Sequence, residues 1–225
     1  MGTCLSPPPP SVAAVDPDAT GFPLLSLPAV GLQCHLFPVT KYQFEFFLGG
    51  TPGAARHPAY DEMQAKSRRV GWRGLTGWPG GVFAVGARLD DAVRFADWLG
   101  GGFRLPTGDE WRAIDAALTA APPPALVSGI APPAFHPAAQ ALAAWALADG
   151  RGTTWRLLGL FENAFLEWVT TLEPRGGLQG RPRPEFARGM VQNPPVHPPQ
   201  RALSDARQSG VAFRLVRRLP RGAAP

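Results

Sequence analysis

The pattern of apolar and polar positions predicts short strands and amphipathic helices in mixed order along the chain. Short apolar or alternating stretches, which are typical of strands, occur within residues 24–36 (as a strand pair), 82–85, 156–160, 167–171 and 211–217. Apolar residues spaced three and four apart, which are typical of helices, occur in residues 41–48, 89–99 and 138–148. This mixture favours an α+β domain built on a small twisted antiparallel sheet, with two main helices and much irregular structure.

Capping residues mark where several of these helices begin and end. Thr40 is the expected N-cap of the helix that begins at residue 41, and the glycines at 100–102 end the helix over 89–99. Thr107 can cap a further helix, with Glu110 three residues later completing a capping box. These signals place helix starts immediately after residues 40 and 107.

Length and composition indicate one folded domain with two loose ends. The chain has 225 residues, of which 45% are hydrophobic, enough for one well-buried core. Residues 1–21 are rich in proline, alanine and aspartate and read as a flexible arm. We therefore expect a single domain over residues 22–219 and a tail over residues 220–225.

Charge and hydropathy argue against nucleic-acid and membrane partners. The net charge is +5 and the pI is near 10, but the basic clusters lack the interleaved aromatic residues that stack on bases. No apolar run approaches the ~18 residues of a membrane-spanning helix. The first residues lack the basic and apolar regions of a secretory signal. We expect synthesis in the cytoplasm, no membrane insertion and no nucleic-acid binding.

The two cysteines, Cys4 and Cys34, form neither a disulfide framework nor a zinc spacing. A reducing compartment is the simplest reading of so few thiols. Many prolines in connecting segments and few lysines are typical of a rigid, heat-stable protein.

Three segments together carry a resemblance to a known family. They are Phe-Arg-Leu-Pro-Thr-Gly-Asp-Glu-Trp at 103–111, Asn-Ala-Phe-Leu-Glu-Trp at 163–168, and Gly-Val-Ala-Phe-Arg-Leu-Val at 210–216. In this order they resemble the formylglycine-generating-enzyme-like (sulfatase-modifying factor) branch of the C-type lectin fold. The resemblance runs from about residue 36 to residue 217, and it implies that the three segments belong to the core of that fold.

Within these segments the residues favour structural roles. Aromatic side chains suit the core, and Arg104, Glu110 and Glu167 are expected to make fixed hydrogen bonds or ion pairs. A fold alone does not supply a function.

The resemblance also implies which chemistry is not expected in this chain. The sulfatase-modifying enzymes use a copper-binding cysteine pair, but the corresponding segment here, residues 187–195, contains no cysteine. A related branch holds iron with three histidines, whereas the four histidines here show no ligand spacing: His35, His57, His136 and His197. We therefore expect no enzyme activity, no catalytic residue, no cofactor and no catalytic metal. The sequence leaves open whether the chain binds a structural calcium ion, which is common in this fold.

The variable proteins of diversity-generating retroelements, many of them phage-encoded, resemble this chain in the core and in lacking those cysteines. In them the C-terminal loops are diversified on a rigid scaffold, which implies a ligand-binding surface between residues 190 and 209 here. The ligand would be a protein or cell-surface molecule, and the chain would be associated with a virion or cell surface. The candidate binding residues are Met190, Gln192, Asn193, Val196, His197, Gln200, Leu203, Ser204, Asp205, Gln208 and Ser209.

Two alternatives remain open from the sequence. One is a formylglycine-generating-type oxidase or related enzyme with a relocated or degenerate site. The other is a structural or regulatory domain of a larger complex. The candidate binding residues could equally belong to a plain polar loop, because one sequence does not show which positions vary.

Overall fold

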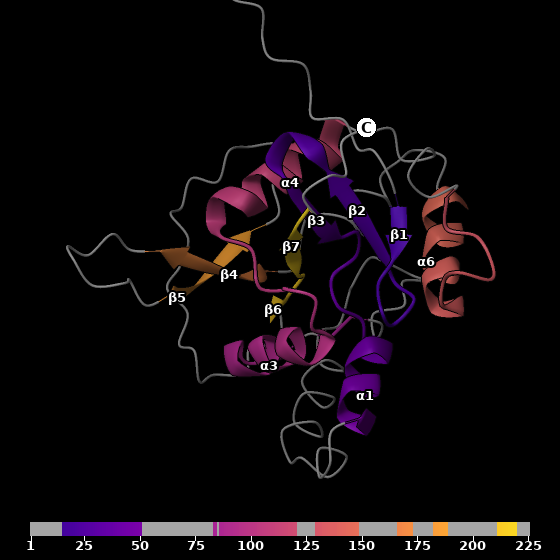
Figure 1. Ribbon diagram of the computed structural model, residues 1–225, viewed down its shortest axis with the longest axis horizontal. Coiled ribbons are helices and arrows are strands. Elements are labelled where there is room, and N and C mark those ends of the chain that lie inside the picture. Colours follow the sequence, from indigo (N-terminus) through magenta and orange to yellow (C-terminus); the bar gives the residue numbers. More distant parts are fainter. Residues whose placement is uncertain are drawn as a thin grey trace, which may run out of the picture.

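Two small sheets and four helices form the described part of the chain. The computed structural model describes residues 15–50, 83–84, 86–120, 129–148, 166–172, 182–188 and 211–219. Helices α1 and α3 lie together at one end, α4 lies towards the other end, and α6 stands beside strand β1 (Figure 1). The mixed α+β class predicted from the hydrophobic pattern is confirmed.

The first sheet has four antiparallel strands in the order β1-β2-β3-β7. The strands are β1 (Val15–Pro17), β2 (Pro23–Leu27), β3 (Leu32–His35) and β7 (Val216–Arg218). The predicted strand pair within residues 24–36 is β2 and β3, joined by a short 3-10 turn at Pro28–Val30 that ends on Gly31 with a left-handed φ of 67°. Every residue of β2 and β3 is buried, so both faces of this sheet are covered at its two central strands.

Strand β1 changes the predicted domain boundary. Its residues pair with β2, and the turn that follows contains the buried Asp18. Residues 15–21 therefore belong to the sheet and its first turn, and the predicted flexible arm over residues 1–21 was too long. Strand β1 is difficult to predict from the sequence, because a three-residue edge strand is held by backbone pairing and needs no apolar periodicity.

The second sheet has three strands in the order β5-β4-β6. They are β4 (Leu166–Leu172), β5 (Pro182–Arg188) and β6 (Val211–Ala212). The β4–β5 pair is antiparallel, but β4 and β6 are parallel. The small antiparallel sheet expected from the sequence is the first sheet, whereas the second sheet, with its parallel pair, was not predicted.

The predicted strand over residues 211–217 is divided between the two sheets. Phe213, Arg214 and Leu215 connect β6 to β7, and the backbone N–H groups of Val39 and His35 donate to the carbonyls of Phe213 and Leu215 at 2.8 and 3.0 Å. The C-terminal segment therefore crosses both sheets and ties them together.

The four helices match the predicted positions closely. They are α1 (Lys41–Gly50), α3 (Leu89–Leu99), α4 (Gly108–Ala120) and α6 (Pro137–Ala148). Helix α1 extends two residues beyond the predicted range 41–48, through Gly49 and Gly50. Of the predicted strand over 82–85, the described part is a single bridge between Phe83 and Thr40. The predicted strand over 156–160 lies outside the described residues.

The core lies where α1, α3 and the second sheet meet. Phe44, Phe95 and Phe213 pack on one another with ring centroids 5.7–6.3 Å apart. Trp168 is fully buried in the same cluster, and its indole N–H donates to the Ala87 carbonyl at 2.9 Å. Burying such aromatic side chains removes large apolar areas from water and dominates core stability.

Candidate functional site

All eleven residues predicted to form the binding surface lie outside the described residues. The structure does describe both ends of the connection that carries them, which runs over residues 189–210. Strand β5 ends at Arg188 and strand β6 begins at Val211, and both of these residues pair with Leu166 on β4. Neighbouring strands lie about 4.8 Å apart, so the two ends of the connection are held roughly 10 Å from each other.

The frame that holds these ends contains a buried ion pair. Arg214, between β6 and β7, donates to the two carboxylate oxygens of Glu167 on β4, with both N···O distances at 2.7 Å. Trp111 of α4 donates its indole N–H to the same carboxylate at 2.9 Å. Each of the three sequence segments that carry the family resemblance contributes one of these residues, so the segments meet in one cluster that joins α4 to both sheets.

Burial shows what this cluster can do. The side chains of Arg214 and Glu167 are 0% and 1% exposed, so a substrate has no access to them. Arg214 Nη1 also approaches the carbonyls of His35 and Leu36 at 3.5 and 3.4 Å. A buried bidentate pair with further acceptors fixes geometry, and the cluster is therefore part of the frame. The structural role predicted for Glu167 is confirmed.

Cys34 lies in this buried region and its chemistry is suppressed. Burial raises the pKa of its thiol to about 12, with the nearby Arg214 and Glu167 charges acting in opposite directions. A thiol is nucleophilic and binds soft metals only as the thiolate, so Cys34 is inert in the folded protein. Cys4 lies outside the described residues.

The predicted capping box at the start of α4 is confirmed. The Thr107 N–H donates to Glu110 Oε2 at 2.8 Å, and the Glu110 N–H donates to Thr107 Oγ1 at 3.2 Å. Arg104 and Glu110 form the expected ion pair, with an N···O distance of 2.6 Å. Burial opposes ionisation of the Glu110 carboxyl, but the Arg104 hydrogen bond and charge and the Thr107 hydrogen bonds hold its pKa below the usual value. Both groups position α4.

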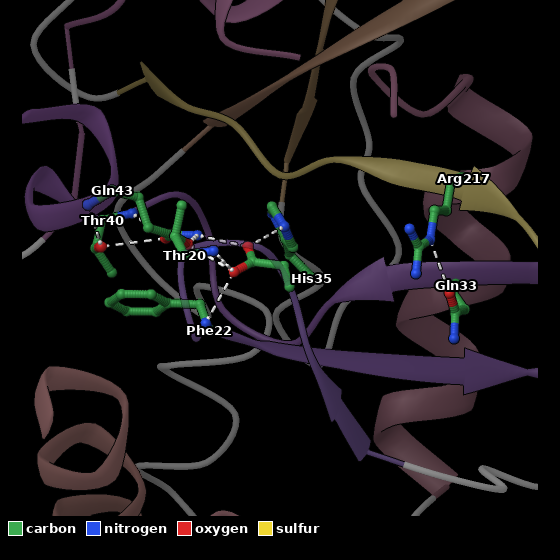
Figure 2. A network of polar contacts seen from close by, with 8 residues as sticks. Thr20, Phe22, Gln33, His35, Thr40, Gln43 and Arg217 are labelled. Atoms are coloured by element: carbon green, nitrogen blue, oxygen red, sulfur yellow. Dashed lines mark hydrogen bonds and ion pairs between the residues drawn. The ribbon is translucent and has the colours of Figure 1, made fainter. Parts of the chain in front are cut away.

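A second buried polar cluster was not predicted from the sequence (Figure 2). The Asp18 carboxylate accepts hydrogen bonds from the N–H groups of Thr20 and Phe22, at 2.7 and 2.9 Å, and from the Thr20 hydroxyl. Gln43 of α1 donates its amide to the other oxygen at 3.1 Å. His35 Nε2 lies 3.0 Å from that same oxygen. One carboxylate thus joins the β1–β2 turn to β3 and α1.

The electrostatics of this cluster favour an ionised Asp18. Burial by itself raises the pKa of the carboxyl, but the His35 imidazole and the hydrogen bonds from Thr20 and Phe22 outweigh it and lower the pKa below its ordinary 3.8. The imidazole of His35 is 2% exposed. Its contact with Asp18 is the 3.0 Å approach of Nε2 to the carboxylate.

Local sequence signals could have located part of this cluster. Thr40 and Gln43 have capping-box spacing, and Thr40 N–H donates to Gln43 Oε1 while Gln43 N–H donates to Thr40 Oγ1. Asp18 two residues before Thr20 is the spacing of an Asx turn. The long-range contact with His35 has no local signal.

The histidines are not brought together as ligands in the described part of the chain. His35 lies in β3, and His136 precedes α6, where its Nδ1 accepts the Ala138 N–H at 3.1 Å and its ring stacks on Phe22. His57 and His197 lie outside the described residues. Among the residues that the structure describes, no three His, Cys, Asp or Glu side chains are grouped to hold a metal ion. No described helix combines the length and apolar character needed to cross a membrane.

No family model, curated protein or solved structure matches this chain. In the part of the chain that the structure describes, the geometry is that of a frame held by buried polar clusters, with a connection fixed at both of its ends.

Proposed function

We propose that this chain is a non-enzymatic ligand-binding protein of the diversity-generating-retroelement variable-protein type. Its fold would be the C-type lectin fold of the formylglycine-generating-enzyme branch. Its binding surface would be carried by the connection between β5 and β6, at residues 190–209. The partner would be a protein or another cell-surface ligand, met on a virion or cell surface.

The observation that carries this proposal is the way both ends of the connection are fixed. Arg188 and Val211 pair with the same residue, Leu166, on opposite sides of β4. The next residue of β4 is Glu167, which makes the buried ion pair with Arg214. Binding residues concentrate on connections placed by a rigid scaffold, because a fixed frame limits the conformational entropy lost on binding.

The pairing of the charged residues supports the same proposal. Four of the five charged residues within the three family-like segments pair with one another, Arg104 with Glu110 and Arg214 with Glu167, and the fifth, Asp109, is exposed and pairs with Arg112. Cys34 is buried with a raised pKa. The described residues near the frame therefore serve to hold structure, and the candidate binding residues lie beyond its ends.

A DNA observation tests the retroelement origin. We expect the gene to be flanked by a reverse-transcriptase gene and by a near-repeat of the codons for residues 190–209, with adenines in the template wherever the two copies differ. Flanking DNA with neither a reverse transcriptase nor a template repeat would overturn the retroelement assignment.

A separate assay tests the non-enzymatic assignment. Titration with copper and incubation with a cysteine-containing sulfatase peptide should give no oxidised product, since the oxidase chemistry relies on a cysteine pair. Stoichiometric copper binding with turnover of the peptide would instead establish an oxidase with a relocated site.

A further inference from the structure

Arg217 on β7 is held in one orientation by the residues around it. Its Nε–H donates to Gln33 Oε1 on β3 at 2.8 Å (Figure 2). Its guanidinium lies over the ring of Phe103, 4.7 Å from the centroid. Gln33 is itself buried, and its amide donates to Ser26 Oγ at 3.0 Å. Ser26 on β2, Gln33 on β3 and Arg217 on β7 thus form a row of polar side chains. The guanidinium at the end of this row is held at one edge by Gln33 and on one face by the Phe103 ring.

The outer edge of this guanidinium has no partner among the residues that the structure describes. Within the described residues, no hydrogen-bond acceptor or carboxylate contacts the Arg217 Nη atoms. Arg217 is half-buried, so those atoms are not sealed from solvent. An arginine fork carries its N–H donors in a plane that matches two oxygens of a carboxylate or phosphate. Holding it in place beforehand lowers the entropy lost when such an anion binds.

A glycine turn lies directly beside the free edge. Gly100, Gly101 and Gly102 have φ values of 69°, 60° and 75°, in the left-handed region that other residues rarely adopt. A Cβ on Gly101 would lie 3.1 Å from Arg217 Nη1, and one on Gly102 would meet no atom within 4 Å. The turn therefore brings bare backbone to the guanidinium at Gly101 and leaves open space at Gly102.

The turn also supplies unused donors. The N–H groups of Gly100 and Phe103 donate to the carbonyls of Ala96 and Gly100, but in the described part of the chain those of Gly101 and Gly102 have no acceptor. Backbone N–H groups beside an arginine are a common way of holding oxyanions in proteins.

We propose that Arg217 and the Gly101–Gly102 backbone form a binding site for an oxyanion, a phosphate or carboxylate group of a ligand. The site lies on β7 and the turn after α3, and it does not depend on residues 190–209. Arg217 would bind two oxygens through its Nη atoms, and the glycine N–H groups would complete the site.

The opposing explanation is that Arg217 only neutralises the carbonyl end of α3, where a cation is favourable. The two explanations predict different responses to phosphate. An arginine that only caps the helix contributes to stability and gives no saturable binding of phosphate. A binding site makes the amide signals of the glycines shift with phosphate concentration until the site is saturated.

The test is a titration of the full chain with inorganic phosphate, followed by amide NMR at constant ionic strength kept with chloride. We expect the Gly101 and Gly102 signals to shift with a saturable, millimolar dependence. Arg217→Ala should weaken this response at least about tenfold, and Arg217→Lys, which keeps the charge but loses the planar fork, should weaken it about threefold or more. The matched control Arg218→Ala removes the same charge from the next, exposed residue and should leave the response within about twofold.

A parallel titration with acetate distinguishes the source of the anion. A saturable acetate response as strong as that of phosphate would identify carboxylates as the ligand group, and a weaker one would identify phosphates. Glycine signals that do not shift with either anion, shift linearly without saturation, or shift equally in Arg217→Ala would overturn the proposal.

Discussion

Replacing Arg214 with methionine is expected to reduce the free energy of unfolding by about 3–5 kcal/mol, because it leaves the Glu167 carboxylate buried without its charge partner. Glu167 is 1% exposed, and of the two residues that donate to its carboxylate in this cluster only Trp111 would remain, through its indole N–H. Methionine fills much of the arginine stem volume, so the loss arises chiefly from the uncompensated charge. Urea denaturation at neutral pH measures it.

A double variant separates charge from packing. Arg214→Met combined with Glu167→Gln removes both charges and should recover part of the loss, since the two residues are directly coupled. Arg217→Met is the matched control: it removes an arginine three residues away that makes one hydrogen bond to Gln33 and lies over the Phe103 ring, and it should cost about 1–2 kcal/mol. A cost below about 1 kcal/mol for Arg214→Met would contradict the role given to this ion pair.

Replacing Asp18 with asparagine should cost about 2–3 kcal/mol at neutral pH, because the buried carboxylate accepts several hydrogen bonds that an amide cannot accept equally. The N–H groups of Thr20 and Phe22 and the side chain of Gln43 lose their charged acceptor. The matched control is Asp16→Asn on the exposed edge strand β1, where the carboxylate has a 3.5 Å contact with Gln33. It should change stability by less than about 0.5 kcal/mol.

The Asp18 effect has a defined pH dependence. The pKa of Asp18 is lowered in the folded protein from its ordinary 3.8, so the unfolded chain takes up a proton at higher pH than the folded one. The stability due to the ionised carboxylate is therefore fully present above pH 3.8 and is lost as the pH falls through the folded-state pKa. The difference in the free energy of unfolding between wild type and Asp18→Asn should shrink as the pH falls through the folded-state pKa. A difference that stays constant down to pH 2 would contradict this prediction.

The sequence predicted the helices well because their signals are local. Thr107 and Glu110 form a capping box in the structure as their spacing indicates, and the apolar stripe of residues 89–99 gives a helix with those bounds. Strand β1 was missed because edge pairing leaves no apolar period. The division of residues 211–217 was missed because it depends on which strands lie beside each half, and that is a tertiary property.

The contacts within the buried polar clusters were also predicted only in part from the sequence. The expectation that Glu167 makes a fixed ion pair was correct, but its partner Arg214 lies 47 positions away, and its second partner, Trp111, lies 56 positions away. No local spacing encodes such contacts. The His35–Asp18 approach joins a strand to a turn that the composition had assigned to a flexible arm.

The central claim, that residues 190–209 form an exchangeable surface on a fixed frame, is tested most directly by replacing the candidate residues together. Substitutions at exposed positions each change stability by within about 0.5 kcal/mol and in either direction. Variants with all eleven candidate residues replaced by different polar residues, the apolar Met190, Val196 and Leu203 included, should therefore keep Tm within about 5 °C of the parent. Trp168→Ala, which empties a fully buried site in the frame, should cost about 3–5 kcal/mol and serves as the comparison. If most of the replaced variants lose as much stability as Trp168→Ala, residues 190–209 are part of the core and the claim is wrong.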